Sequence, residues 1–212
     1  MFCNRIKVTV SFAIMLFATA AGCATNSPEN IRKRMGDGDP VAGADKIAIC
    51  MACHAVDGNS TASNYPKLAG QYGDYILKQL IDFRSGDRKD PMISAMVQSA
   101  GNDQDLLDIA AYYASQDQMK SDKWSFNRAG KKRFNDVENG CVNCHGANGK
   151  GMAPDQSHAP VIGGQQKSYL IKQLKSFRSG ERANDPGGIM GSVTASMSDD
   201  EIENIASYVS GL

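Results

Sequence analysis

The chain has 212 residues, and its 23 lysine and arginine residues balance 23 aspartate and glutamate residues, so the formal net charge at pH 7 is zero. This balance gives none of the net positive charge that marks most nucleic-acid-binding chains, and we expect no nucleic-acid partner. Only six cysteines and three histidines are present, so their positions along the chain are informative.

The first 22 residues are predicted to form a signal peptide. Arg5 and Lys7 give a positive start, and a mostly apolar run follows from residue 8 to about residue 20. This run is too short to span a bilayer and is typical of a secretory signal. The stretch Ala20-Ala-Gly-Cys23 resembles a bacterial lipobox, in which the cysteine becomes the lipidated first residue, although leucine is commoner where Ala20 stands. The alternative is ordinary cleavage near Ala24.

Residues 23–39 are expected to form a tether, because they combine polar, basic, glycine and proline residues without an apolar pattern. Such a spacer would suit a domain that is held at a membrane by a lipid on Cys23. We therefore expect a periplasmic protein, either free or anchored to a membrane as a lipoprotein.

A five-residue motif, Cys-x-x-Cys-His, occurs twice, as Cys50-Met-Ala-Cys53-His54 and as Cys141-Val-Asn-Cys144-His145. This is the attachment signature of a c-type haem. Two cysteines three residues apart share one face of a helix, so one porphyrin can bond to both through its vinyl groups. The histidine that follows then supplies an axial ligand to the iron. The sequence predicts two covalently bound haem c groups.

Other uses of these cysteines are a redox disulfide in each motif or a single four-cysteine zinc site. Neither explains why both pairs are followed by a histidine. Cys3 lies in the predicted signal peptide and Cys23 is the candidate anchor, so no cysteine is left for a structural disulfide. Covalent haem attachment takes place after export, which agrees with the predicted signal.

The remainder of the chain is a tandem repeat. Matching segments, offset by 94 residues, include Tyr75–Leu80 with Tyr169–Leu174 and Phe83–Gly86 with Phe177–Gly180. We assign residues 40–117 to domain 1 and 118–212 to domain 2. Each is predicted to contain three main helices around its haem: one with the haem motif, one over the matching segments, and one that begins at a polar cap. No segment alternates with a period of two, so an all-α fold is expected.

The order of these elements resembles class I c-type cytochromes, and their duplication resembles the dihaem cytochrome c4 family. The resemblance covers roughly residues 40–212. It implies two cytochrome c domains and an electron carrier that acts between a quinol-oxidising complex and a terminal oxidase of a respiratory chain. It also implies that the carbonyl groups of Pro66 and Pro160 accept a hydrogen bond from the axial histidines.

The resemblance places the second axial ligand in the loop before the last helix of each domain. In domain 2 this predicts Met190, with Met197 in the core. In domain 1 the offset of 94 residues selects Met96, whereas the family's Pro-x-Met pattern falls on Ile93, beside Met92. Both Met92 and Met96 remain candidates.

Several further residues have open roles. Met152 and the spare His158 are expected in a loop, and Trp124 between the domains. Four arginines in the repeated Phe-Arg-Ser-Gly-x-Arg stretch could pair with haem propionates or lie exposed at a helix end: Arg84, Arg88, Arg178 and Arg182. Residues 24–117 hold nine basic and 13 acidic residues, and residues 118–212 hold 12 and 10, so the two domains could present different faces to partners.

The function that we predict is electron transfer without catalysis, through docking on membrane redox complexes. Axial ligands from the protein on both sides of each iron would exclude a substrate. Two alternatives remain: a dihaem peroxidase, which needs one iron with an open coordination position, and a haem subunit of a larger oxidoreductase. The ambiguity between Met92 and Met96 is the feature that keeps the peroxidase open.

Overall fold

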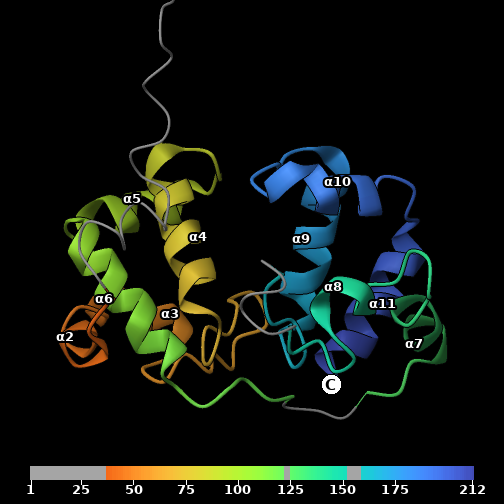
Figure 1. Ribbon diagram of the computed structural model, residues 1–212, viewed down its shortest axis with the longest axis horizontal. Coiled ribbons are helices and arrows are strands. Elements are labelled where there is room, and N and C mark those ends of the chain that lie inside the picture. Colours follow the sequence, from red (N-terminus) through yellow and green to blue (C-terminus); the bar gives the residue numbers. More distant parts are fainter. Residues whose placement is uncertain (1–36, 122–124, 152–158) are drawn as a thin grey trace, which may run out of the picture.

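The computed structural model describes residues 37–121, 125–151 and 159–212, and within these ranges it contains helices, turns and loops but no strands. Two helical domains lie side by side, joined by a connector along one edge (Figure 1). Domain 1 contains α2 (Pro40–Ala44), α3 (Ala48–His54), α4 (Gly73–Ser85), α5 (Pro91–Ser99) and α6 (Asp103–Ala114). Domain 2 contains α7 (Arg128–Phe134), α8 (Val142–His145), α9 (Lys167–Ser179), the 3₁₀ helix η1 (Pro186–Gly188), α10 (Ile189–Thr194) and α11 (Asp199–Ser210).

The predicted all-α fold of two repeated domains is confirmed, and each domain has more helices than the three expected. The haem motifs lie on the short helices α3 and α8. The sequence reading missed a separate first helix in each domain, α2 or α7, and the helix before the last one, α5 or α10. In the described part of the chain, no helix is both long and apolar enough to cross a membrane.

The helix ends follow from local chemistry. Asn102 and Ser198 begin α6 and α11, and each forms a capping box with the acidic residue three positions later, Asp105 or Glu201. The long helices α4 and α9 both end in a glycine with a left-handed backbone, which spares them the strain that a Cβ atom would introduce. The polar cap expected at the start of the last main helix is therefore confirmed in both domains.

In each domain the first helix crosses the last one at a glycine. A Cβ atom on Gly43 would overlap the Asp108 carbonyl group of α6, and one on Gly130 would overlap the Asn204 carbonyl group of α11. Both glycines are buried. Because they lack a side chain, α2 can lie directly on the backbone of α6, and α7 on that of α11.

Each domain has its own apolar core beside its haem motif. In domain 1, Leu77 of α4 and Leu106 of α6 are fully buried, and Cys50 packs against the same cluster. In domain 2, Phe134 and Ile202 take the corresponding role, and Cys141 packs against them. The first thiol of each haem motif therefore faces an apolar interior.

Candidate functional site

The two cysteine pairs lie in different domains, one on α3 and one at the start of α8 (Figure 1). Their separation rules out a single four-cysteine zinc site. Neither pair is joined by a disulfide. Burial, with a smaller contribution from neighbouring Cys53, raises the pKa of the Cys50 thiol to about 11, and burial likewise raises the pKa of Cys141.

The two histidines of the motifs are oriented alike. The Nδ1 atom of His54 lies 2.9 Å from the carbonyl oxygen of Pro66, and that of His145 lies 2.8 Å from the carbonyl oxygen of Pro160. Because a carbonyl oxygen can only accept, Nδ1 carries the proton in both rings and Nε2 has a free lone pair. This is the arrangement by which proteins hold a metal-binding imidazole in one orientation.

Burial also keeps these imidazoles neutral. It lowers the pKa of His54 and of His145, against the opposite effect of the hydrogen bonds to the proline carbonyls. His145 is the more enclosed of the two and is 6% exposed. A neutral imidazole with a free Nε2 is the form that binds iron.

An apolar cavity of about 570 Å³, counting its open mouth, lies beside the motif of domain 1. Cys50, Cys53 and His54 line one side of it, and Met96 lines it from α5. The hydroxyl of Tyr113, which also lines the cavity, is buried without a hydrogen-bond partner among the described residues. Two thiols, an imidazole, a thioether and an unpaired hydroxyl around an apolar cavity fit a haem with polar edge groups.

The two candidate methionines of domain 1 differ in position. Met96 lines the cavity, whereas Met92 does not and is 46% exposed. Both belong to α5, which begins at the Asp90 cap. One turn of helix therefore separates a side chain directed at the cavity from one directed at solvent.

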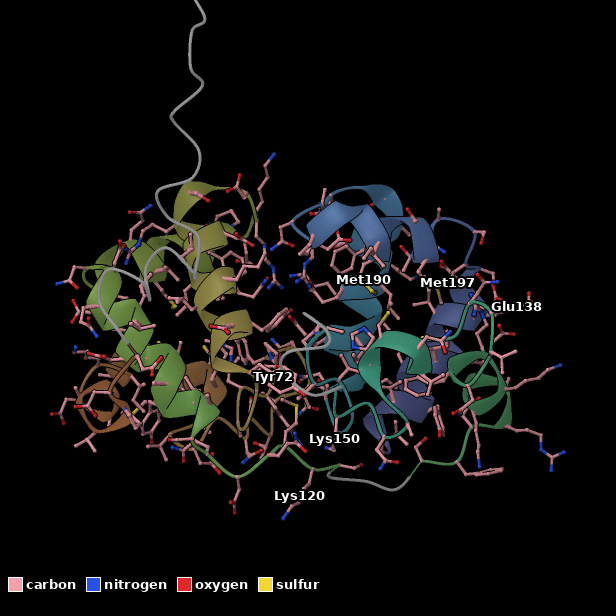
Figure 2. The ribbon with its side chains drawn as sticks, in the orientation of Figure 1. Tyr72, Lys120, Glu138, Lys150, Met190 and Met197 are labelled. Carbon is pink, nitrogen blue, oxygen red and sulfur yellow. The ribbon has the colours of Figure 1, made fainter. Side chains whose placement is uncertain are left out.

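In domain 2, Met190 is held by α10. Its backbone N–H donates to Asp185 Oδ2 at 2.7 Å, and its carbonyl accepts from Thr194 Oγ1 at 2.8 Å. In the view of Figure 2, Met190 lies between α10 above and α8, which carries the haem motif, below. Met197 is 5% exposed and belongs to the core cluster, as predicted.

The four arginines of the repeat fall into two classes. Arg84 and Arg178 bind the start of the last helix in their own domains: Arg84 pairs with Asp103, and Arg178 pairs with Asp199. Arg88 and Arg182 are instead buried between the domains, 9% and 8% exposed. The repeated sequence pattern does not distinguish these two classes.

The buried arginines form one network with an approximate two-fold symmetry. Arg88 donates to Tyr169 Oη of domain 2 at 3.1 Å, and Arg182 donates to Tyr75 Oη of domain 1 at the same distance. The described residues provide neither guanidinium group with a carboxylate within 4.0 Å, and the bonds go to hydroxyl and amide oxygens such as Gln79 Oε1. Two buried positive charges therefore lie between the haem domains without a directly paired carboxylate, and Asp185 attracts Arg182 only from a greater distance.

Two buried glutamines at equivalent positions of the repeat also join the domains. Gln71 of domain 1 hydrogen-bonds the backbone of Val161, and Gln165 of domain 2 hydrogen-bonds the backbone of Lys67. Met152, His158, Trp124, Cys3 and Cys23 lie outside the described residues.

A paired set of Cys-x-x-Cys-His helices, oriented imidazoles and methionine-bearing helices, repeated in two all-α domains, defines a dihaem c-type cytochrome. The family model described as cytochrome c matches this chain twice, over residues 42–117 and 128–212. The chain belongs to the cytochrome c family, and its tandem form is that of the cytochrome c4 family.

Its relatives agree in length and in structure. Cytochrome c4 of Stutzerimonas stutzeri is 42% identical over 191 residues, which cover 82% of this chain and 90% of the relative. The crystal structure of reduced recombinant cytochrome c4 from Pseudomonas stutzeri has a TM-score of 0.75 and 41% identity, and covers 82% of this chain and 99% of that one. The thiosulfate dehydrogenase electron acceptor of Stutzerimonas stutzeri strain A1501 is 32% identical over 195 residues, which cover 84% of this chain and 88% of the relative. The protein is thus a dihaem electron-transfer cytochrome with two covalent haem c groups.

Proposed function

We propose that this protein is a non-catalytic electron carrier whose two irons are each ligated by one histidine and one methionine: His54 with Met96, and His145 with Met190. When bound, each haem supplies an iron that takes up and releases one electron. The observation that carries the proposal is the domain 1 cavity, where His54 and Met96 come from different elements to one apolar space. With both axial positions filled by the protein, no position is left for a substrate.

The protein groups around each haem favour the reduced state. A methionine thioether is soft and uncharged, so it stabilises ferric iron less than a second histidine would and raises the potential. The apolar lining of the cavity acts in the same direction, because low polarity disfavours the extra positive charge of the oxidised centre. The hydrogen bond to the Pro66 carbonyl keeps the ring of His54 in one orientation in both oxidation states.

Arg88 and Arg182 are proposed to neutralise haem propionates. Both are buried between the domains. Among the described residues neither guanidinium group has a carboxylate within 4.0 Å, and Arg182 is attracted at longer range by that of Asp185. Burying a cation without a counter-charge is costly, which favours an anion supplied by the bound groups. The Phe83 and Phe177 rings stack on these guanidinium groups at 4.5 and 4.4 Å and restrict their movement.

Replacing the methionines one at a time tests the ligand assignment. Met96→Ala is expected to remove the weak sulfur-to-iron absorption band of one haem and to open that iron to carbon monoxide, with one molecule bound per chain. Met190→Ala is expected to do the same at the other iron. Met92→Ala is the matched control on the same helix, and its exposed side chain predicts a stability change within about 0.5 kcal/mol and no carbon monoxide binding.

Carbon monoxide binding by Met92→Ala, together with no binding by Met96→Ala, would reverse the assignment in domain 1. Rapid turnover of hydrogen peroxide by the unaltered protein, or carbon monoxide binding without any substitution, would instead favour the peroxidase.

The partners that we propose are a quinol-oxidising complex as donor and a terminal oxidase as acceptor, with the protein in the periplasm. Support comes from the predicted export signal, from the lipobox-like sequence that ends at Cys23, and from the similarity to cytochromes c4. The direct test is to add the purified protein to membranes that have been washed free of soluble cytochromes. It should restore quinol-dependent oxygen consumption, and failure to be reduced by the quinol-oxidising complex would contradict the assignment.

A thiosulfate dehydrogenase is a second candidate electron donor, which one of the relatives favours. A relative that matches 84% of this chain is described as a thiosulfate dehydrogenase electron acceptor. Mixing the oxidised protein with thiosulfate and a thiosulfate dehydrogenase distinguishes the two donors, because only an acceptor of that enzyme would be reduced at rates that match its turnover.

A further inference from the structure

Each of the two glutamines at the domain interface makes the same pair of hydrogen bonds, to one backbone residue of the other domain. Gln165 of domain 2 accepts from the Lys67 N–H at 2.7 Å and donates to the Lys67 carbonyl oxygen at 2.9 Å. Gln71 of domain 1 accepts from the Val161 N–H at 2.9 Å and donates to the Val161 carbonyl oxygen at 2.8 Å. All four residues are at most 4% exposed. Each domain therefore holds one backbone residue of the other in a water-free contact.

The residues that are held in this way follow the prolines that orient the axial histidines. The Lys67 N–H belongs to the same peptide group as the Pro66 carbonyl, which accepts the Nδ1 proton of His54. The Val161 N–H likewise shares a peptide group with the Pro160 carbonyl, the acceptor for His145. One peptide unit thus carries two hydrogen bonds in series, from the histidine of one domain to the glutamine of the other.

Hydrogen bonds in series polarise one another. When a peptide N–H donates to a glutamine oxygen, electron density moves toward the carbonyl oxygen of the same peptide, which becomes a better acceptor. A stronger acceptor for the Nδ1 proton makes the imidazole a more electron-rich ligand. A more electron-rich ligand stabilises ferric iron, so the effect lowers the reduction potential of that haem.

We propose that Gln165 and Gln71 are positioning residues that act across the interface: Gln165 strengthens the hydrogen bond of His54 and lowers the potential of haem 1, and Gln71 does the same for His145 and haem 2. This inference rests on His54 and His145 as axial ligands. Glutamine suits the role because its single amide offers both the acceptor and the donor that one backbone residue requires.

The test replaces each glutamine with methionine, which keeps most of the volume and removes both hydrogen bonds. The potentials of the two haems are measured separately by spectroelectrochemistry, and the Nδ1 proton of each axial histidine is followed by NMR in the reduced protein. Gln166→Met is the matched control, because the Gln166 side chain also donates across the interface, but to the Ser60 carbonyl oxygen at 2.6 Å rather than to the residue after a proline.

Gln165→Met is expected to increase the equilibrium constant for reduction of haem 1 about threefold. The reduction potential of haem 1 would then rise by about 28 mV, since a tenfold change corresponds to 59 mV for one electron. The Nδ1 proton of His54 should move upfield as its hydrogen bond weakens, while haem 2 and His145 are unchanged. Gln71→Met should give the reciprocal pattern, with haem 2 affected. Gln166→Met should shift neither potential selectively.

Three results would overturn the inference. In a variant that keeps both low-spin haems and both sulfur-to-iron bands, unchanged potentials would show that the glutamine does not affect the haem of the other domain. The proposed electron-carrier function would still hold. Equal shifts at both haems, or a shift at the haem of the glutamine's own domain, would show a general loosening of the interface. If neither variant accumulates with two haems, NMR of the unaltered reduced protein provides the test. Scalar couplings across the hydrogen bonds from the Lys67 and Val161 N–H groups to the glutamine amides are expected, and their absence would overturn the proposal.

Discussion

Gly130→Ala is a small substitution for which the structure predicts a large loss of stability. A Cβ atom at this position would overlap the Asn204 carbonyl oxygen, and it would lie 2.7 Å from the Asn204 carbonyl carbon and 2.8 Å from the Cβ atom of Tyr208. Both neighbours belong to the α11 helix, whose backbone cannot rotate away as a side chain can. The two helices must therefore separate.

The magnitude follows from two opposing effects. Overpacking of a tight contact costs about 1–3 kcal/mol and occasionally more, and we expect the upper end because the obstacle is backbone. Alanine in place of a helical glycine returns about 0.5–1 kcal/mol. The net loss is about 2 kcal/mol, or a fall of roughly 8–16 °C in the melting temperature of a domain of this size.

Thermal unfolding of the haem-loaded reduced protein, followed by circular dichroism, measures this effect. Gly191→Ala in α10 is the matched control, because its Cβ atom would meet only the Phe177 carbonyl oxygen, at 3.9 Å. It should leave the melting temperature unchanged or raise it slightly. A Gly130→Ala protein as stable as the unaltered protein would refute the close crossing of α7 and α11.

Three other expectations concern charge and location. Burial raises the pKa of Asp108, but hydrogen bonds from Lys46 and two other groups outweigh burial, so the pKa lies below its ordinary value. The stability that this carboxylate contributes is present above about pH 4 and is lost as the pH falls through the pKa of the folded state. Asp108→Asn should therefore reduce the loss in the free energy of unfolding of domain 1 as the pH falls below about 4. An unchanged pH dependence would contradict this expectation. Arg88→Gln should lower at least one haem potential, since a buried cation favours reduced iron, while Arg84→Gln should not, because Arg84 is partly exposed and paired with Asp103. Equal effects in spectroelectrochemical titration would contradict a special role for Arg88. Cys23→Ser should release the protein from membranes into the soluble periplasmic fraction if the lipobox-like sequence is used, and an unchanged distribution between fractions would count against a lipid anchor.

The sequence was sufficient for the features that depend on local chemistry. The haem motifs, the capped starts of α6 and α11 at Asn102 and Ser198, and the glycine ends of α4 and α9 could all be predicted, because each depends on a few neighbouring residues. The short helices α2 and α7 could not. They are too short to show an amphipathic pattern, and their packing depends on contact with the last helix of the domain.

The choice between Met92 and Met96 could not be made from spacing. The caps Asn102 and Ser198 differ by 96 positions, so counting back from them places the counterpart of Met190 at Ser94, midway between the two methionines. The two methionines are one turn apart on the same face of α5, so only the position of that helix beside the cavity distinguishes the side chain that lines it from the one that is largely exposed.

The contacts between the two domains could not be predicted from the sequence either. Gln71 and Gln165 are recognisable as equivalent positions of the repeat, but each bonds a residue about 90 positions away, in the other domain. The burial of Arg88 and Arg182 has the same origin, since a charged residue after a helix end is ordinarily exposed. Contacts created by docking two folded domains leave no periodic pattern in either one.

Intact-mass spectrometry of the denatured, acid–acetone-treated protein, purified from cells that attach haem c, determines whether the chain carries two covalent haems. The expected mass exceeds that of the mature polypeptide by two haems, which remain bound because thioether bonds survive the treatment. A colourless polypeptide of unmodified mass, or a single retained haem, would contradict it.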